Sequence, residues 1–141
     1  MIHHTTNVRV RYPDTDKMGV VYHGVYVEYL ETGRTEMLRE LGLANSALEE
    51  SGVMLPVLEV CVVMRRPARY DEMLTVHTFL RRPIGARMQL EYEIYRDAEL
   101  LVTGRTSHAF TTVDTMKPVR PPKALLDLLA AADDGTGLHE A

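Results

Sequence analysis

Residues 12–26 read YPDTDKMGVVYHGVY, and along this segment the pattern of the chain changes from strand to helix. Asp14 and Asp16 fall on a predicted turn, Gly19 follows, and an apolar step leads into the helix. A carboxylate beside a helix N-terminus can act as a nucleophile or a base. Backbone N–H groups of the first helical turn, assisted by the helix dipole, can stabilise a developing oxyanion. The segment therefore offers both components of acyl-transfer chemistry.

The patterns on either side predict one long helix after a first strand. Residues 5–12 alternate between apolar and polar side chains, as a strand does. Residues 21–41 carry apolar side chains at helical spacing, and Gly42 is placed to end the helix. Gly33, within the apolar stripe, costs about 1 kcal/mol relative to alanine in a helix. We therefore expect the helix to lie close against another backbone at Gly33.

The rest of the chain is mainly of period two and predicts an α+β fold. Four strands are expected at residues 57–64, 74–80, 88–95 and 100–113, a short helix at 45–51 and a terminal helix at 123–131. A lone central helix among antiparallel strands suggests a sheet that wraps around the helix. Long strands leave exposed edges, which favours dimerisation by edge pairing. Residues 1–131 form one predicted domain, and residues 132–141 a flexible tail.

Composition excludes several classes of protein. The chain has 141 residues, enough for one domain with a core, and its net charge of −4 argues against nucleic-acid binding. Its single cysteine, Cys61, excludes an internal disulfide and predicts a buried, inert thiol in a reducing compartment. No apolar run reaches the roughly 18–20 residues that span a bilayer, and the N-terminus lacks signal-peptide features. We expect no integral membrane segment and a cytoplasmic location.

Several motifs together resemble those of one enzyme family. They are DTDxxGVVYHxxY at residues 14–26, RTExL at 34–38, PARYDE at 67–72, EYEI at 91–94, HAF at 108–110 and KPVRP at 117–121. From about residue 8 to residue 122, the chain is similar to the 4-hydroxybenzoyl-CoA thioesterase family of hotdog-fold acyl-CoA hydrolases. It is closest to the branch that includes the tol–pal-associated acyl-CoA thioesterase.

The resemblance implies a residue-specific site. Asp16 is the family's catalytic carboxylate, which attacks the thioester carbonyl or activates a water to do so. A backbone N–H in the His23–Gly24 region would polarise the carbonyl, and Tyr22 and Tyr26 are candidate substrate contacts. His23 departs from the family's prototype but matches the tol–pal-associated branch, which speaks against an aromatic substrate. The family uses no metal or cofactor, since coenzyme A is part of the substrate, and builds its site between subunits, so a homodimer or homotetramer is expected.

Other readings of the same residues are weaker. Asp14 fits better as a turn former than as a second catalytic carboxylate. An EF-hand calcium loop would need acids where Met18 and Val25 stand. No serine lies in a G-x-S-x-G elbow, and no Cys/His spacing supports a zinc site. His77 and His108 lie in predicted strands, where structural roles are favoured.

Arginines and apolar side chains supply the remaining candidates. The guanidinium fork suits the phosphates of coenzyme A, and two groups could serve: Arg81, Arg82 and Arg87 around one turn, or Arg65, Arg66 and Arg69 around Pro67. Arg87 is the first choice. Candidate acyl-pocket residues are Met18, Tyr26, Tyr29, Met54, Leu55 and Met64. The alternative functions are a hotdog dehydratase or hydratase, and a non-catalytic module that binds acyl-CoA or acyl-carrier protein.

Overall fold

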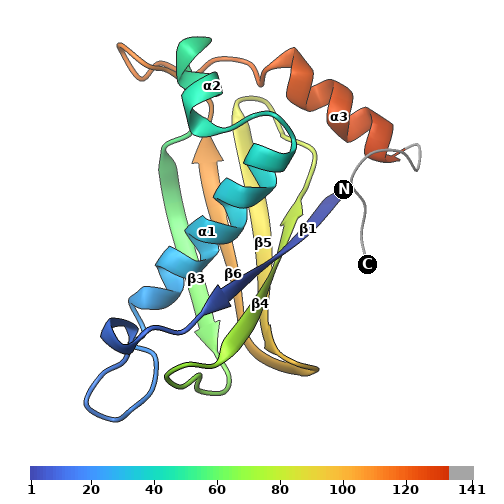
Figure 1. The fold of residues 1–141 in the computed structure, drawn as a ribbon. Coiled ribbons are helices and arrows are strands. Elements are labelled where there is room, and N and C mark those ends of the chain that lie inside the picture. The colour runs from blue at the N-terminus through green and yellow to red at the C-terminus, as the bar shows by residue number, and fades with distance from the viewer. Residues whose placement is uncertain (134–141) are drawn as a thin grey trace.

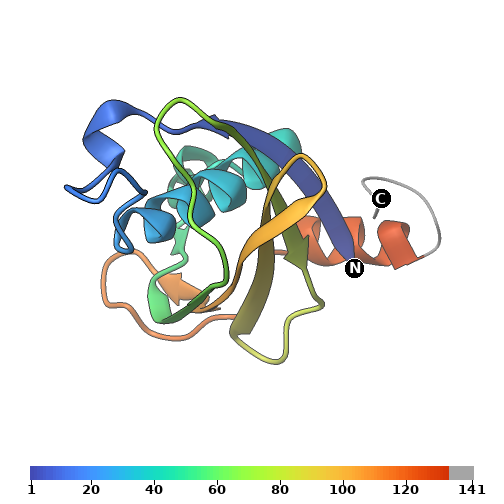
Figure 2. The same cartoon turned by 90° about the horizontal axis from the view of Figure 1, so that it is seen from below.

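The structure is a computed structural model that describes residues 1–133. A five-stranded antiparallel sheet curves around one long helix (Figures 1 and 2). In spatial order, its strands are β1 (Ile2–Arg9), β4 (Met73–Leu80), β5 (Arg87–Arg96), β6 (Glu99–Ala109) and β3 (Val57–Met64). The helix, α1, spans Val25–Glu40. The α+β architecture predicted from the sequence is confirmed.

Helix α1 packs its apolar stripe on the sheet, and Gly33 permits the closest approach. A Cβ atom at Gly33 would lie 2.5 Å from Oγ1 of Thr78 and 2.8 Å from Cγ1 of Val76, both on β4. The expected close approach is therefore present, although the atoms that Gly33 meets belong to side chains rather than to backbone. The buried helix residues are Tyr26, Tyr29, Leu30, Gly33, Met37 and Leu38.

The C-terminal end of α1 follows the sequence prediction. Gly42 adopts a φ of 78°, which is left-handed and costs glycine little. The N–H of Gly42 donates to the carbonyl of Arg39 at 3.0 Å, and the N–H of Leu43 donates to the carbonyl of Leu38 at 2.7 Å. These bonds satisfy two of the carbonyls that a helix end leaves unpaired.

Several boundaries differ from the predictions. β1 begins at Ile2, three residues early, because Ile2 and His3 pair with Leu80 and Phe79 and are buried there. Residues 12–14 form a 3₁₀ turn instead of continuing the strand, and α1 begins at residue 25 rather than 21.

The C-terminal part of the chain also departs from the predicted pattern. The last predicted strand divides into β6 and the short β7 (Thr111–Thr112), which pairs with β2 (Val53–Met54). The short helix α2 spans Asn45–Glu50, and the terminal helix α3 spans Lys123–Asp133. Helix α3 thus runs two residues past the predicted domain boundary, and the rest of the predicted tail lies outside the described residues.

The two edges of the sheet differ in character. Along β1, the exposed side chains are polar: Thr5, Asn7 and Arg9. Along β3, large apolar side chains are exposed by 39–51%: Val57, Leu58, Val60, Val63 and Met64. An exposed apolar edge strand is a template for pairing with another chain. None of the helices within residues 1–133 has the length and apolar character needed to span a membrane.

Candidate active site

Asp16 begins a tight hairpin between the 3₁₀ turn and α1. Its N–H donates to the carbonyl of Val20 at 2.9 Å, and its carbonyl accepts from Gly19 at 3.0 Å. Gly19 has a φ of 78°, a conformation that a larger residue adopts only with strain. Oδ1 of Asp16 accepts the N–H of Met18 at 2.8 Å. Among the described residues nothing donates to the second oxygen, Oδ2, which is therefore available for chemistry.

Asp14 has the opposite environment and holds the turn together. It is only 5% exposed, and it accepts hydrogen bonds from the Arg11 N–H (3.0 Å), the Tyr29 hydroxyl (2.9 Å) and the Arg11 guanidinium (3.3 Å). Burial by itself would raise the pKa of Asp14, but these three donors together lower it below the usual value. Asp14 is thus a fully engaged carboxylate that links the turn to α1.

The first turn of α1 presents unpaired backbone donors. The carbonyls of Tyr22 and His23 accept the N–H groups of Val25 and Tyr26, at 2.9 and 3.3 Å. Within residues 1–133, the N–H groups of His23 and Gly24 themselves have no acceptor. A Cβ at Gly24 would lie 2.9 Å from Cε2 of Tyr22, so a larger residue would collide with the ring. Glycine here lets Tyr22 lie over the helix start.

A cavity of about 310 Å³ joins this helix start to the loop that follows β3. Its walls are Asp16, Val20, Val21, His23, Tyr26, Met64, Arg65, Arg66 and Pro67. The N–H of Val21 donates to the carbonyl of Ala68 at 2.8 Å, and Val20 and Arg69 form a β-bridge, which fixes one wall against the other. Burial raises the pKa of Tyr26 and outweighs the hydrogen bond with the backbone of Ala68, which lowers that pKa. The phenol of Tyr26 therefore stays neutral. The cavity thus has one carboxylate, two guanidinium groups, the imidazole of His23 and the phenol of Tyr26 in an otherwise apolar lining.

Some predicted site residues meet in this cavity and others do not. Asp16, His23, Tyr26 and Met64 line it, and the half-exposed Tyr22 lies beside His23, with ring centroids 4.3 Å apart.

Four of the predicted acyl-pocket residues lie elsewhere. Met18 is 81% exposed on the hairpin. Met54 and Leu55 line a separate cavity of about 280 Å³, with Arg34 and Val57, at the other end of β3. Tyr29 is buried and engaged by Asp14. The sequence places Met54 and Met64 at opposite ends of the predicted strand at residues 57–64, but it does not show which end lies beside Asp16.

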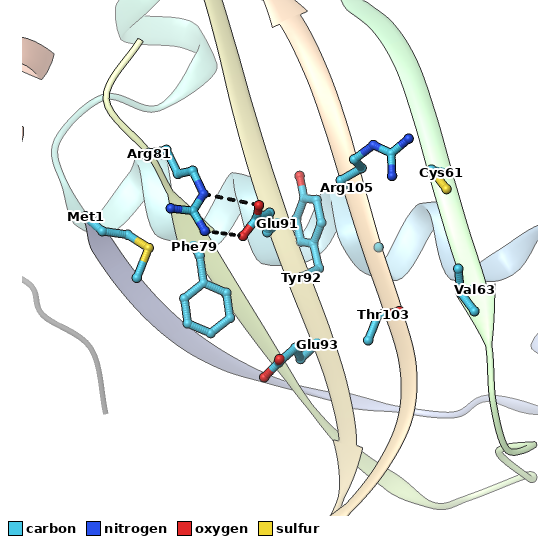
Figure 3. Close-up of a pocket in the computed structure, with 11 residues that line it drawn as sticks. Met1, Cys61, Val63, Phe79, Arg81, Glu91, Tyr92, Glu93, Thr103 and Arg105 are labelled. Atoms are coloured by element: carbon cyan, nitrogen blue, oxygen red, sulfur yellow. Dashed lines mark hydrogen bonds and ion pairs between the residues drawn. The ribbon is translucent and has the colours of Figure 1, made fainter.

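The preferred arginines lie far from Asp16 within one chain. Arg81 forms two hydrogen bonds with Glu91, at 3.1 and 2.8 Å, in a groove of about 410 Å³ on the outer face of the sheet (Figure 3). Arg82 and Arg87 flank the β4–β5 turn, one full strand away from the loop that contacts the Asp16 hairpin. Eight residues of strand span about 26 Å, at roughly 3.3 Å per residue. Arg65 and Arg66 of the second group are the arginines that line the Asp16 cavity.

The remaining titratable candidates, His108 on β6 and His77 on β4, do not line the Asp16 cavity. His108 is fully buried, and its Nε2 lies 2.8 Å from Oγ1 of Thr106, which in turn lies 2.7 Å from the Tyr92 hydroxyl. Burial, followed by the charge of Arg34, lowers the pKa of His108 to about 4, so the ring is neutral at pH 7. Nδ1 of His77 lies 2.8 Å from Nε2 of His3.

Neither a metal cluster nor a buried thiol is present among residues 1–133. Across residues 1–133, no three His, Cys, Asp or Glu side chains gather closely enough to hold a metal ion. Cys61 is half-buried rather than buried, because it lies on the outer face of the edge strand β3. The prediction of a buried thiol was wrong for that reason.

Comparisons with known proteins agree on one class of enzyme. Residues 10–129 match the model of the thioesterase-like superfamily. The chain is 36% identical over 121 residues to the putative acyl-CoA thioesterase YneP of Bacillus subtilis, covering 85% of this chain and 88% of that protein. It is also 36% identical over 121 residues to the acyl-CoA thioester hydrolase YbgC of Escherichia coli, covering 84% and 90%. Among solved structures, DHNA-CoA thioesterase from Staphylococcus aureus is similar with a TM-score of 0.87 and 30% identity, covering all of both chains.

Proposed function

Because this chain belongs to the thioesterase-like superfamily, whose fold is the hotdog fold, we propose that it hydrolyses acyl-CoA to a free acid and coenzyme A with Asp16 as its catalytic carboxylate. Membership makes it an enzyme that cleaves thioesters. The assignment of the reacting groups rests on the geometry of the Asp16 cavity. One observation carries it: Asp16, which has a free carboxylate oxygen, and His23, whose backbone N–H has no acceptor among the described residues, line the same cavity, and the equally unpaired N–H of Gly24 follows directly in the chain.

The chemistry follows from this arrangement. The thioester carbonyl enters between Asp16 and the start of α1, where the N–H groups of His23 and Gly24 stabilise the negative charge that develops on its oxygen. Oδ2 of Asp16 attacks the carbonyl carbon or takes a proton from an attacking water. Collapse of the intermediate expels the thiolate of coenzyme A, which takes up the proton released from the attacking water. On the water route the free acid forms directly, whereas on the nucleophile route the acyl–Asp16 anhydride is hydrolysed by a water in a second step. Oδ1 remains held by the Met18 N–H, which fixes the orientation of the carboxylate throughout.

His23 and Tyr22 complete the mouth of the cavity. His23 lines it, and its ring lies against the Tyr22 ring, so both can pack along the substrate. We propose that they position the thioester rather than transfer protons. Tyr26 forms part of the buried wall beneath them.

A second copy of the chain completes the acyl pocket. Antiparallel pairing of two β3 edges places the Val57 end of one strand beside the Met64 end of the other. Met64 lines the Asp16 cavity, whereas Met54 and Leu55 lie at the Val57 end. We propose that the partner subunit supplies these two side chains to the acyl group, so the smallest active unit is a homodimer. Arg82 and Arg87 lie a strand length away from the loop beside Asp16 in one chain. We therefore propose them as phosphate contacts only for the active site of the partner subunit.

Thiol release from a panel of short-chain, long-chain and aromatic acyl-CoA substrates tests the proposal. Asp16→Asn should lower kcat by at least about 100-fold, as expected for loss of a general base or nucleophile. Asp127→Asn, an exposed aspartate on α3, is the matched control and should keep full activity. Circular dichroism and gel filtration should be unchanged in both variants. Undiminished thiol release by Asp16→Asn would contradict the assignment.

A further inference from the structure

We propose that Arg65 binds a phosphate group of the coenzyme A moiety at the Asp16 site of its own chain. The proposal rests on the proposed function, because it identifies how the substrate of that site is held. Two hollows on the surface meet at this residue. Arg65 and Arg66 line the Asp16 cavity, and both also line a broad depression of about 1000 Å³ over the β5–β6 hairpin. A substrate with its thioester at Asp16 therefore has a continuous surface along which its polar end can leave.

The backbone holds Arg65 in a defined place. The N–H groups of Arg65 and Arg66 both donate to the carbonyl of Leu101, at 2.8 and 3.1 Å. Pro67 restricts the backbone of Arg66, the residue that follows Arg65. The hairpin opposite is closed by a two-residue turn, with Asp97 at a φ of 52°. Both walls of the depression are therefore built on strand ends rather than on long loops.

Charge distinguishes Arg65 from its neighbours. Arg66 lies 3.3 Å from a carboxylate oxygen of Glu99, and Arg96 pairs with Glu72 at 2.8 Å and also with Glu99. Within residues 1–133, the Arg65 guanidinium has no carboxylate partner. The lining of the depression contains three arginines and two carboxylates, in a chain whose net charge is −4. Arg65 thus carries an uncompensated positive charge where the depression meets the cavity.

This charge suits a phosphate of the substrate. A guanidinium can donate two parallel hydrogen bonds to a phosphate, and such charge-assisted bonds are stronger than neutral ones. Coenzyme A carries a pyrophosphate and a 3′-phosphate at the end remote from the thioester. Arg81, by comparison, has its guanidinium fork occupied by Glu91 on the outer face of the sheet (Figure 3). Arg65 is free to meet an anion and borders the catalytic cavity.

The test compares three thioesters of one acyl group: the coenzyme A, dephospho-coenzyme A and N-acetylcysteamine derivatives. Arg65→Ala should lower kcat/KM for the coenzyme A thioester about tenfold or more, mainly by raising KM. The reason is that a charge-assisted hydrogen bond worth about 1.4 kcal/mol corresponds to a tenfold change in binding. The N-acetylcysteamine thioester, which has no phosphate, should react unchanged. Arg65→Lys should restore part of the loss. Arg105→Ala is the matched control, because Arg105 is also exposed and has no ion pair among the described residues, but lies on the outer face (Figure 3).

The outcomes separate this proposal from the proposed function. A loss that persists with the dephospho derivative assigns Arg65 to the pyrophosphate, and a loss that disappears assigns it to the 3′-phosphate. Equal losses with all three thioesters, or no loss with any, would overturn the proposal. Asp16→Asn should lower kcat for all three thioesters alike, by at least about 100-fold. Calorimetric binding of free coenzyme A, weakened by Arg65→Ala, checks the phosphate contact even if no thioester is turned over.

Discussion

Asp14 and Asp16 are two residues apart, yet the backbone gives them different chemistry. Asp14 turns inward and accepts three hydrogen bonds, whereas Asp16 keeps one oxygen free at a cavity wall. A carboxylate surrounded by donors is a poor base, because those donors stabilise its charged form. Composition and spacing alone cannot distinguish the two. The difference depends on Arg11 and Tyr29, and Tyr29 comes from the second turn of α1.

Asp14→Asn should destabilise the protein at neutral pH by about 1–3 kcal/mol, because an amide nitrogen would face the Arg11 donors. The folded-state pKa of Asp14 is lowered, so its stabilising effect is complete above the unfolded pKa of about 3.9 and disappears as pH falls through the folded value. The difference in unfolding free energy between wild type and variant should therefore shrink below about pH 4. Urea denaturation at pH 7 and pH 3 measures it.

Tyr29→Phe provides the comparison for Asp14→Asn. It removes one donor to Asp14 and leaves the charge and both Arg11 contacts in place, so its cost should be smaller. A cost of Asp14→Asn that stays constant across this pH range would argue against an ionised, hydrogen-bonded Asp14.

At the scale of elements, the contact between α1 and β4 depends on the absence of a side chain at Gly33. Alanine normally stabilises a helix interior by about 1 kcal/mol relative to glycine. Here the added methyl would lie within 2.8 Å of two β4 side chains, so Gly33→Ala should instead destabilise the fold by about 1–3 kcal/mol. Urea denaturation of Gly33→Ala tests the sign.

A double-mutant cycle identifies the cause. In a Thr78→Ala background, where the nearer of the two contacts is removed, Gly33→Ala should cost less than it does alone. Additive costs would mean that the helix is destabilised by something other than the contact with β4.

The sequence predicts local features well where the signal is itself local. Gly42 ends α1 as expected, since a left-handed glycine and its hydrogen bonds involve only neighbouring residues. β1 was placed too late because Ile2 and His3 are recognisable as strand only through Leu80 and Phe79, more than seventy residues away. The order of strands cannot be read from periodicity, so the sequence does not show that the length of β4 lies between Arg87, the first choice for a phosphate contact, and the loop beside Asp16. The candidate site was predictable only for the part contained in residues 14–26.

At the scale of the whole molecule, the two sheet edges indicate how copies of the chain should associate. β1 exposes polar side chains, whereas β3 exposes large apolar ones. Burying the β3 edge between two chains should therefore stabilise a dimer more than burying the β1 edge. Met54, on β2, and Met64, at the end of β3, line separate cavities, so the proposed contact of both with one acyl group needs two chains.

Val63→Lys, on the exposed β3 edge, should shift the protein from dimer to monomer. Thioesterase activity should fall in proportion to the fraction of protein that is monomeric. Val63 is 47% exposed, and a lysine there would place a charge in the middle of the paired edges. Sedimentation velocity and thiol release, measured over the same range of protein concentration, give the two readouts. Met73→Lys changes a residue exposed by 43% at the start of β4 and should alter neither. A monomeric Val63→Lys variant with full activity would show that one chain holds a complete site.

The bonds between the Asp16 hairpin and the β3–β4 loop have a further consequence for how the site meets its substrate. The N–H of Val21 in the hairpin donates to the carbonyl of Ala68. Just after β1, the N–H of Val10 donates to the carbonyl of Glu72, and the N–H of Asp71 donates to the carbonyl of Val10. Residues 10–21 and 68–72 should therefore exchange amide hydrogens as one cooperative unit. The conformational entropy of ordering both walls is then lost on folding rather than on binding. A preorganised site of this kind admits substrate without opening a lid. Its amide protection should change little when coenzyme A binds.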